Sequence, residues 1–227
     1  MKPRLLLEQA VLPNGQTLAL HEHDGRHQLT LDGEPLAGPQ TRTGEQALAE
    51  LALSPFISVR QPVVWMAGLG VGATLAAVKA NLRQKKGVYL YGEPCADLPK
   101  WIERHVDPDL LADSRVARDP DVSPGTLARH QGEIHAILVH ADTAPPAEDG
   151  GLLVRNPRWI AAAYDALKDG GLLAITALRP IPKIDLLLNR AGFDIVRHEI
   201  ESSPNARRPR RLPLWLARKG SFVSQHR

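Results

Sequence analysis

One stretch of the chain constrains its fold more than any other. In Val63–Thr74 (VVWMAGLGVGAT), a short apolar run leads through Gly68, Gly70 and Gly72 directly into a segment of helical composition. Glycines permit a tight turn and remove the Cβ atoms that would keep a ligand away from the backbone. The helix that follows presents unpaired N–H groups and the positive end of its dipole. The stretch therefore predicts a strand, turn and helix that bind a nucleoside-bearing ligand, although a ligand-free turn would have the same pattern.

The chain beyond residue 62 repeats this alternation of strand and helix. Strands that alternate with helices of about ten residues indicate a parallel sheet with right-handed crossovers. The last two strands, Phe193–Ile200 and Leu214–Ala217, are joined by a polar loop and predict an antiparallel hairpin at one edge. The other expected strands are 63–67, 87–91, 115–117, 134–139 and 172–176, and the expected helices are 73–82, 98–105, 157–167 and 182–191.

The first part of the chain has a different pattern. Leu5–Val11, Thr17–His21 and His27–Leu31 are strand-like and are separated by turn signals, among them Asn14-Gly15 and Asp24-Gly25. Such spacing is typical of antiparallel hairpins. We therefore predict a small β-hairpin module over residues 1–43, and a Rossmann-like α/β domain over residues 44–227 that begins with a helix.

Composition narrows the function. The net charge is +3 and aromatic residues make up 4%, whereas nucleic-acid binding calls for a basic face with stacking aromatics or a recognition motif. Nucleic acid is therefore not the expected partner, although the basic segment Arg207–Arg211 leaves anion or nucleic-acid binding open as a weaker alternative. The longest apolar stretch, Pro62–Val78, is shorter than the ~20 residues of a membrane span. Cys95 is the single cysteine, which fits a reducing compartment, and the N-terminus lacks a long apolar signal. We expect a cytoplasmic protein.

Acidic and histidine residues supply the remaining candidates. Glu93 ends the strand after the glycine turn, where a carboxylate in nucleotide-binding βαβ units accepts hydrogen bonds from ribose hydroxyls. A surface carboxylate would have the same spacing. His21 and His23 would share one face of a strand, but the sequence places no third ligand near them, and we expect no metal.

These features together resemble a known family. The Gly68–Thr74 turn, the Gly92-Glu93 strand end, Ile134–Val139 leading to Asp142, and Leu167–Thr176 (LKDGGLLAIT) are similar to the class I S-adenosylmethionine-dependent methyltransferase fold. The hairpins that contain His27–Gly33 (HQLTLDG), followed by a helix with Glu45, resemble more particularly the spermidine synthases, which are aminopropyltransferases. The resemblance covers nearly the whole chain.

The resemblance implies roles for individual residues. Gly68, Gly70 and Gly72 would face the amino-acid part of S-adenosylmethionine or of its decarboxylated form, Glu93 would hold the ribose, and Asp121 would bind the adenine amino group. In the synthases an Asp-x-x-Asp-Pro loop after the fourth strand binds and deprotonates the attacking amine. Here His140 occupies the position of the first aspartate in that loop, and Asp142 follows two residues later. Binding and deprotonation of the acceptor amine would therefore depend on His140 and Asp142.

The sequence also departs from the family. The Tyr-His-Glu segment after the hairpins is missing, with Gly44-Glu45-Gln46 as its nearest counterpart, and Val71 stands where the synthases favour aspartate. The resemblance nevertheless implies a transferase, homodimeric like the synthases, that passes an aminopropyl group, or alternatively a methyl group, to a small amine. The open alternative is an inactive relative that retains the fold as a ligand-binding or dimerisation module.

Overall fold

The protein contains two sheets joined by a short connection. The structure is a computed structural model, and it describes residues 3–12, 14–202 and 210–222. The first sheet is antiparallel, with the order β1-β2-β3-β4. Its strands are β1 (Leu5–Val11), β2 (Thr17–His23), β3 (Arg26–Leu31) and β4 (Glu34–Ala37).

The hairpins form where the turn residues predicted them. Asp24 and Asp32 have φ of 51° and 50°, and the glycine that follows each of them is also left-handed. This conformation suits the short hairpin loops between paired strands. The fourth strand was not predicted because its four residues include Pro35, which gives a weak strand signal.

The second sheet is mostly parallel and has seven strands in the order β10-β11-β9-β8-β5-β6-β7. Only β11 runs antiparallel to its neighbours, between β9 and β10. The predicted parallel sheet with a C-terminal antiparallel hairpin is therefore confirmed. Its strands are β5 (Val63–Ala67), β6 (Val88–Gly92), β7 (Val116–Asp119), β8 (Ile134–His140), β9 (Leu167–Thr176), β10 (Phe193–Glu201) and β11 (Arg211–Lys219).

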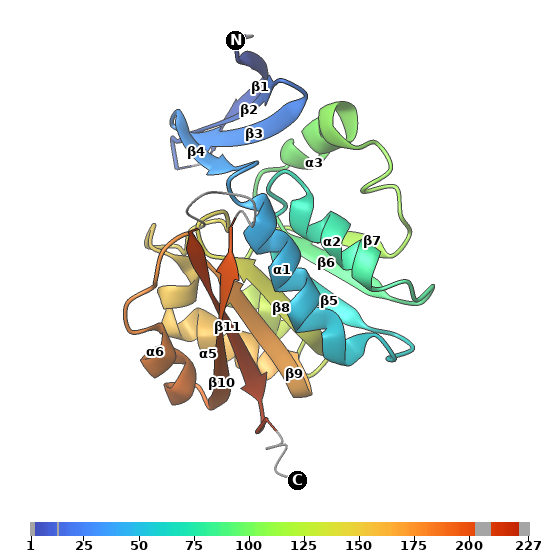
Figure 1. The fold of residues 1–227 in the computed structure, drawn as a ribbon, viewed down its shortest axis with the longest axis vertical. Coiled ribbons are helices and arrows are strands. Elements are labelled where there is room, and N and C mark those ends of the chain that lie inside the picture. The colour runs from blue at the N-terminus through green and yellow to red at the C-terminus, as the bar shows by residue number, and fades with distance from the viewer. Residues whose placement is uncertain (1–2, 13, 203–209, 223–227) are drawn as a thin grey trace.

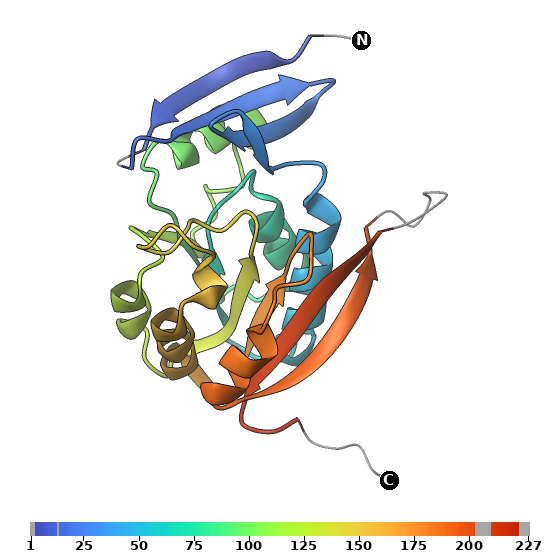
Figure 2. The same ribbon diagram turned by 90° about the vertical axis from the view of Figure 1, so that its left-hand side faces the viewer.

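Helices cover both faces of this sheet (Figures 1 and 2). On β5, Val64 and Met66 pack into the core beneath α1 and α2, whereas Trp65 and Ala67 pack into the core beneath α4 and α5. Burial on both faces explains why the strand is an unbroken apolar run. The helices are α1 (Arg42–Leu53), α2 (Ala73–Asn81), α3 (Leu98–Trp101), α4 (Pro124–Ala128), α5 (Pro157–Ala166) and α6 (Ile184–Arg190), with 3-10 turns at Ser54–Phe56 and Leu153–Arg155 and a π-helical turn at Ile102–Val106.

Two boundaries differ from those expected. Helix α1 begins at Arg42, so a division between residues 43 and 44 falls in its first turn, and that division stays a prediction. Strand β9 begins at Leu167 and includes the Asp169-Gly170-Gly171 segment that was expected to stop the preceding helix. A Cβ on Gly171 would lie 2.9 Å from the Lys168 carbonyl oxygen, so glycine lets the chain pass there within the strand.

The four-stranded sheet lies across the ends of the large sheet at which the parallel strands finish (Figures 1 and 2). Glu8 on β1 contributes to this attachment, because its Oε1 accepts a hydrogen bond from Arg104 at 2.6 Å and lies 2.9 Å from His105 Nε2. Ligands of open α/β sheets bind at the carboxyl ends of the strands, and here the small sheet covers that end. No helix among the described residues is both long and apolar enough to cross a membrane.

Candidate functional site

The turn after β5 has the conformation that its glycines predict. Gly68, Gly70 and Gly72 have φ of 90°, 54° and 84°, which is the left-handed region that other residues rarely adopt. Gly68 N–H donates to the Gly92 carbonyl oxygen at 2.9 Å, so the turn is joined to the end of β6. Helix α2 begins directly after Gly72.

The three glycines face different surroundings. A Cβ on Gly68 would lie 2.9 Å from Pro145 Cδ, and one on Gly72 would lie 2.4 Å from Leu110 Cδ2. Protein side chains therefore pack against these two positions, and Gly72 lines a separate groove beside α2. Gly70 lines the central pocket described below. The ligand contacts predicted for all three glycines stay predictions, and Gly70 has the most direct access.

Glu93 holds the turn in place from the end of β6. Its Oε2 accepts a hydrogen bond from the Leu69 N–H at 3.1 Å, and its Oε1 accepts one from the Cys95 N–H at 3.0 Å. The side chain is buried, and this burial raises its pKa, although the hydrogen bonds from Cys95 and Leu69 act in the opposite direction. Each carboxylate oxygen retains a second lone pair, and Glu93 lines the central pocket.

The central pocket is a cavity of about 280 Å³ between the two sheets. Leucines of the small sheet form one wall, and the other wall comes from Gly70, the Glu93–Cys95 segment and the loop after β8. Its apolar wall and few polar groups are typical of small-molecule sites. The lining residues include Leu12, Asn14, Gln16, Leu18, Leu29, Leu31, Leu36, Gly70, Glu93, Pro94, Cys95, Leu98 and the segments 141–146 and 150–152.

His140 and Asp142 lie at the end of β8, and the structure separates their roles. Asp142 lines the central pocket, and its Oδ2 accepts a hydrogen bond from the Leu178 N–H at 2.7 Å. The His140 ring is buried, and neither ring nitrogen has a hydrogen-bond partner in the structure; Nδ1 lies 3.9 Å from Asp142 Oδ2. Burial lowers the pKa of His140 to about 4, although the nearby Asp142 charge raises it. A neutral imidazole therefore lies behind the Asp142 carboxylate.

Glu45, on α1, also belongs to the site, although its sequence context alone did not assign it a role. It is 2% exposed, and its Oε2 has no hydrogen-bond partner in the structure. Burial raises its pKa to about 7, although Thr41 and Arg42 lower it. With Leu48, Ala49 and Ala52 it forms the buried stripe of the helix. A carboxylate in the first position of such a stripe is the signal that could have identified it.

Glu45 and His140 share a second, much smaller cavity beneath the glycine turn. This inner chamber has a volume of about 10 Å³, which is room for about one water-sized group. Its other lining residues come from β5, the glycine turn, α2, β8 and Thr143. Gly70 and Thr143 line both the inner chamber and the central pocket.

Asp121 does not join this group. Its Oδ1 accepts hydrogen bonds from the Ser123 N–H at 2.8 Å and the Thr126 hydroxyl at 2.5 Å. Burial alone would raise its pKa, but the hydrogen bonds from Thr126 and Ser123 outweigh this effect and lower it. Asp121 thus organises the start of α4 and is not among the described residues that line the central pocket. Its predicted contact with adenine stays a prediction.

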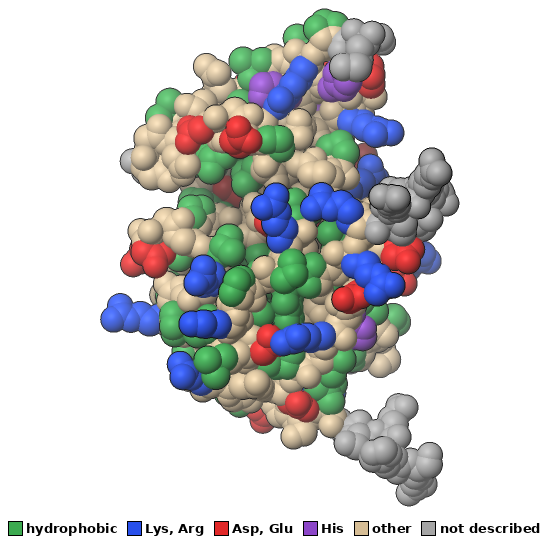
Figure 3. All heavy atoms as spheres, turned by 60° about the vertical axis from the view of Figure 1, so that its left-hand side comes forward, with side chains coloured by type: hydrophobic (Ala, Val, Ile, Leu, Met, Phe, Trp, Pro, Cys, Tyr) green, Lys and Arg blue, Asp and Glu red, His purple; other side chains and the backbone are tan. Residues whose placement is uncertain are grey.

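Other candidates contribute little to the site. Within the described parts of the chain, His, Cys, Asp and Glu side chains form no group of three suited to a metal ion. Arg207 and Arg208 of the basic segment lie outside the described residues, and Arg211 pairs with Glu199 at 2.9 Å. On the face shown in Figure 3, lysine and arginine side chains lie among hydrophobic and acidic ones.

Comparison of the structure with solved structures decides the fold family. A spermidine synthase in complex with the transition-state analogue AdoDATO superimposes with a TM-score of 0.70 and 17% identity, over 95% of this chain and 74% of that one. The fold is that of the spermidine synthases. A probable spermidine synthase from Corynebacterium glutamicum gives a TM-score of 0.69 and 11% identity, over 99% of this chain and 83% of that one.

The wider class matches as well. A precorrin-6y C5,15-methyltransferase from Geobacter metallireducens gives a TM-score of 0.56 and 15% identity, over 76% of this chain and 87% of that one. No protein-family model matches the sequence, and no curated protein is similar to it in sequence. The class I methyltransferase-like fold is thus shared at low sequence identity.

Proposed function

We propose that the protein is a spermidine-synthase-like transferase that uses decarboxylated S-adenosylmethionine to pass an aminopropyl group to a small amine. The observation that carries this proposal is the set of ionisable side chains that line the two cavities. Their described lining residues include the carboxyl groups of Glu45, Glu93 and Asp142 and no lysine or arginine. Such a lining favours ligands that carry only positive charges, such as a decarboxylated sulfonium nucleoside and an amine. It disfavours a ligand that carries a carboxylate, such as S-adenosylmethionine.

The residues present fit such a cofactor. Glu93 lines the pocket with remaining acceptor capacity for two ribose hydroxyls, and Gly70 exposes bare backbone beside it. When bound, the sulfonium nucleoside supplies a carbon made electrophilic by its positively charged sulfur. The small sheet covers this end of the pocket with Leu18, Leu29 and Leu31, which restricts access of water to the reacting atoms.

Asp142 is proposed to act on the acceptor. A primary amine with a pKa near ~10 must lose a proton before it attacks. Asp142, fixed by the Leu178 N–H, attracts the ammonium group and receives this proton, which then leaves to solvent. The C–N bond forms as the C–S bond breaks, and a thioether is released. The neutral His140 ring behind Asp142 adds no positive charge that would repel the amine, so we assign it a positioning role.

The test is direct turnover. Incubation with decarboxylated S-adenosylmethionine and putrescine should yield methylthioadenosine, detected by mass spectrometry, and Asp142→Asn should reduce its formation at least ~100-fold, as expected when an acid–base group is lost. Calorimetry should show tighter binding of the decarboxylated cofactor than of S-adenosylmethionine. A clear preference for the carboxylated form would favour methyl transfer instead.

A second candidate function is a ligand-binding or dimerisation module without catalysis. It is favoured by the burial of His140, which lines the inner chamber and not the central pocket at the position where the family has its first aspartate. Nucleoside binding without turnover for any amine would support this candidate. The homodimer and the cytoplasmic location remain predictions.

A further inference from the structure

The inner chamber combines two features that rarely occur together. It is very small, with a volume of about 10 Å³, yet polar atoms of Glu45 and His140 that line it have no hydrogen-bond partner in the structure. Buried polar atoms are almost always paired, so an unpaired cluster calls for an explanation such as a missing ligand group. The missing partner must be small and must be able to donate to a carboxyl oxygen.

The chamber lies at one end of the central pocket. In the strand order β8-β5-β6 the glycine turn is in the middle, with Glu93 on one side of it and His140 and Asp142 on the other. Because Gly70 and Thr143 line both cavities, a ligand whose sugar lies at Glu93 can extend an alkyl chain past Gly70 toward Glu45. Glu45 is close to this route, since its Oε1 would lie 3.9 Å from a Cβ on Gly70.

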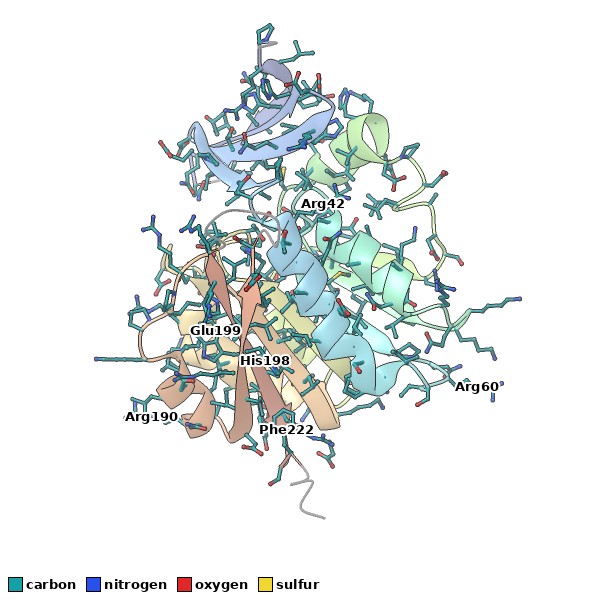
Figure 4. The ribbon with its side chains drawn as sticks, viewed as in Figure 1. Arg42, Arg60, Arg190, His198, Glu199 and Phe222 are labelled. Atoms are coloured by element: carbon teal, nitrogen blue, oxygen red, sulfur yellow. The ribbon has the colours of Figure 1, made fainter. Side chains whose placement is uncertain are left out.

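The charges around Glu45 leave it without a cationic partner in the chamber. The ionisable groups among the described lining residues are Glu45 itself and His140. Arg42 is one helical turn away, but it is exposed and lines the separate groove beside α2 (Figure 4). At the end of β8, His140 is neutral near pH 7, and Asp142, which lies between it and the central pocket, is an acid. The other lining side chains are apolar or, in Thr74 and Thr143, hydroxyl groups.

We propose that Glu45 is the binding site for the terminal ammonium group of the cofactor's aminopropyl chain, and that it thereby selects an amine-terminated sulfonium nucleoside over an amino-acid-terminated one. This inference rests on the proposed function. A cofactor that carried a carboxylate beside its ammonium would place two like charges in a chamber without a basic side chain. An ammonium alone donates to the unpaired Oε2 and satisfies it.

Binding is then coupled to a proton. The ligand ammonium keeps its protons, and the proton held by the neutral Glu45 carboxyl leaves to the buffer as the ion pair forms. Because the Glu45 pKa is about 7 in the free protein, about half a proton is released per ligand near pH 7, and the number falls toward zero above pH ~9. The affinity for the amine-terminated nucleoside therefore rises with pH through this range.

Calorimetry with two nucleosides tests the inference. Decarboxylated S-adenosylmethionine carries the ammonium group, and methylthioadenosine lacks it. Titrations of the wild type in buffers of different ionisation enthalpy measure the protons released with each. We expect the first nucleoside to release more protons than the second, because Glu93 meets the ribose of both and any proton that it releases is common to the two titrations.

Variants add a second measurement. Glu45→Gln should weaken binding of the decarboxylated cofactor about ten- to a hundredfold, the loss of one charge-assisted hydrogen bond, and should abolish the difference in proton release between the two nucleosides. It should leave the methylthioadenosine affinity unchanged. Glu50→Gln, an exposed position on the same helix, is the matched control and should change neither.

The outcomes separate this inference from the proposed function. If methylthioadenosine binds but Glu45→Gln leaves the decarboxylated cofactor unaffected, or weakens both nucleosides equally, the role of Glu45 is refuted and the nucleoside site stands. If the wild type binds neither nucleoside, both proposals are overturned. Proton release by the wild type is measured without a substitution, so it tests the idea even if the variant folds poorly.

Discussion

The buried Glu45 carboxyl should make the ligand-free protein less stable as the pH rises, and Glu45→Gln should remove this effect. In the unfolded chain the carboxyl ionises at its ordinary pKa of 4.5, whereas burial raises the pKa to about 7 in the folded protein. The folded state therefore holds a proton that the unfolded state has lost. Its contribution to stability is fully present below pH ~4.5 and is lost as the pH rises through about 7.

The magnitude follows from the two pKa values. Each pH unit between them corresponds to about 1.4 kcal/mol, so raising the pKa from 4.5 to about 7 is equivalent to about 3 kcal/mol. Glutamine has nearly the same shape and does not ionise. We therefore expect Glu45→Gln to match the wild type near pH 4.5 and to exceed its free energy of unfolding by about 3 kcal/mol at pH 8.5.

Urea denaturation at several pH values between 4.5 and 8.5 measures this difference. With an m-value of about 3 kcal/mol/M, the urea midpoints of the variant and the wild type should separate by about 1 M at the alkaline end. Glu50→Gln on the exposed face of α1 should follow the wild type throughout. A difference between Glu45→Gln and the wild type that stays constant with pH would refute the reasoning, because it would show that Glu45 titrates alike in both states.

Two further predictions concern stability. Gly72→Ala should destabilise the protein by about 2–4 kcal/mol, because the alanine would be strained in the left-handed conformation and would also clash with Leu110. Thermal melts should show a smaller loss for Gly132→Ala, where the new methyl group meets open space. Equal losses for the two variants would count against the clash. The buried neutral ring of His140 resists protonation, so the wild type should lose about 3 kcal/mol of stability as the pH falls from 6.5 through about 4. His140→Asn should not show this loss. If urea midpoints of wild type and His140→Asn fall in parallel below pH 6.5, His140 is not the cause.

The sequence predicted the fold better than the site, for a physical reason. The strand, glycine turn and helix at Val63–Thr74 are fixed by local chemistry, since left-handed turn residues and apolar runs act over a few positions. The same holds for the Asp-Gly hairpins of the small sheet. Strand β4 and the early start of β9 were missed because pairing with neighbouring strands determines them, and the local residues give a weak or contrary signal.

The site depends on long-range packing. Gly68 and Gly72 were predicted to face a ligand, and the structure adds that Pro145 and Leu110, which are distant in sequence, pack against them. Asp121 was predicted from its position after a strand, and the structure adds the hydrogen bonds that its carboxylate accepts from Ser123 and Thr126. The ligand contacts of all three stay predictions. Such outcomes follow from which side chains meet in space, and one-dimensional spacing does not contain that information.

The hydrogen bonds of Glu93 have a consequence for how a ligand is received. This one carboxylate accepts hydrogen bonds from the amides of both Leu69 and Cys95, so the glycine turn and the Glu93–Cys95 segment already have their conformation in the ligand-free protein. These two amides should therefore exchange slowly with deuterated solvent before any nucleoside is added. Little conformational freedom then remains to be lost on association. The binding site for a nucleoside is thus preformed, so the association rate of the nucleoside should be limited by its passage beneath the small sheet.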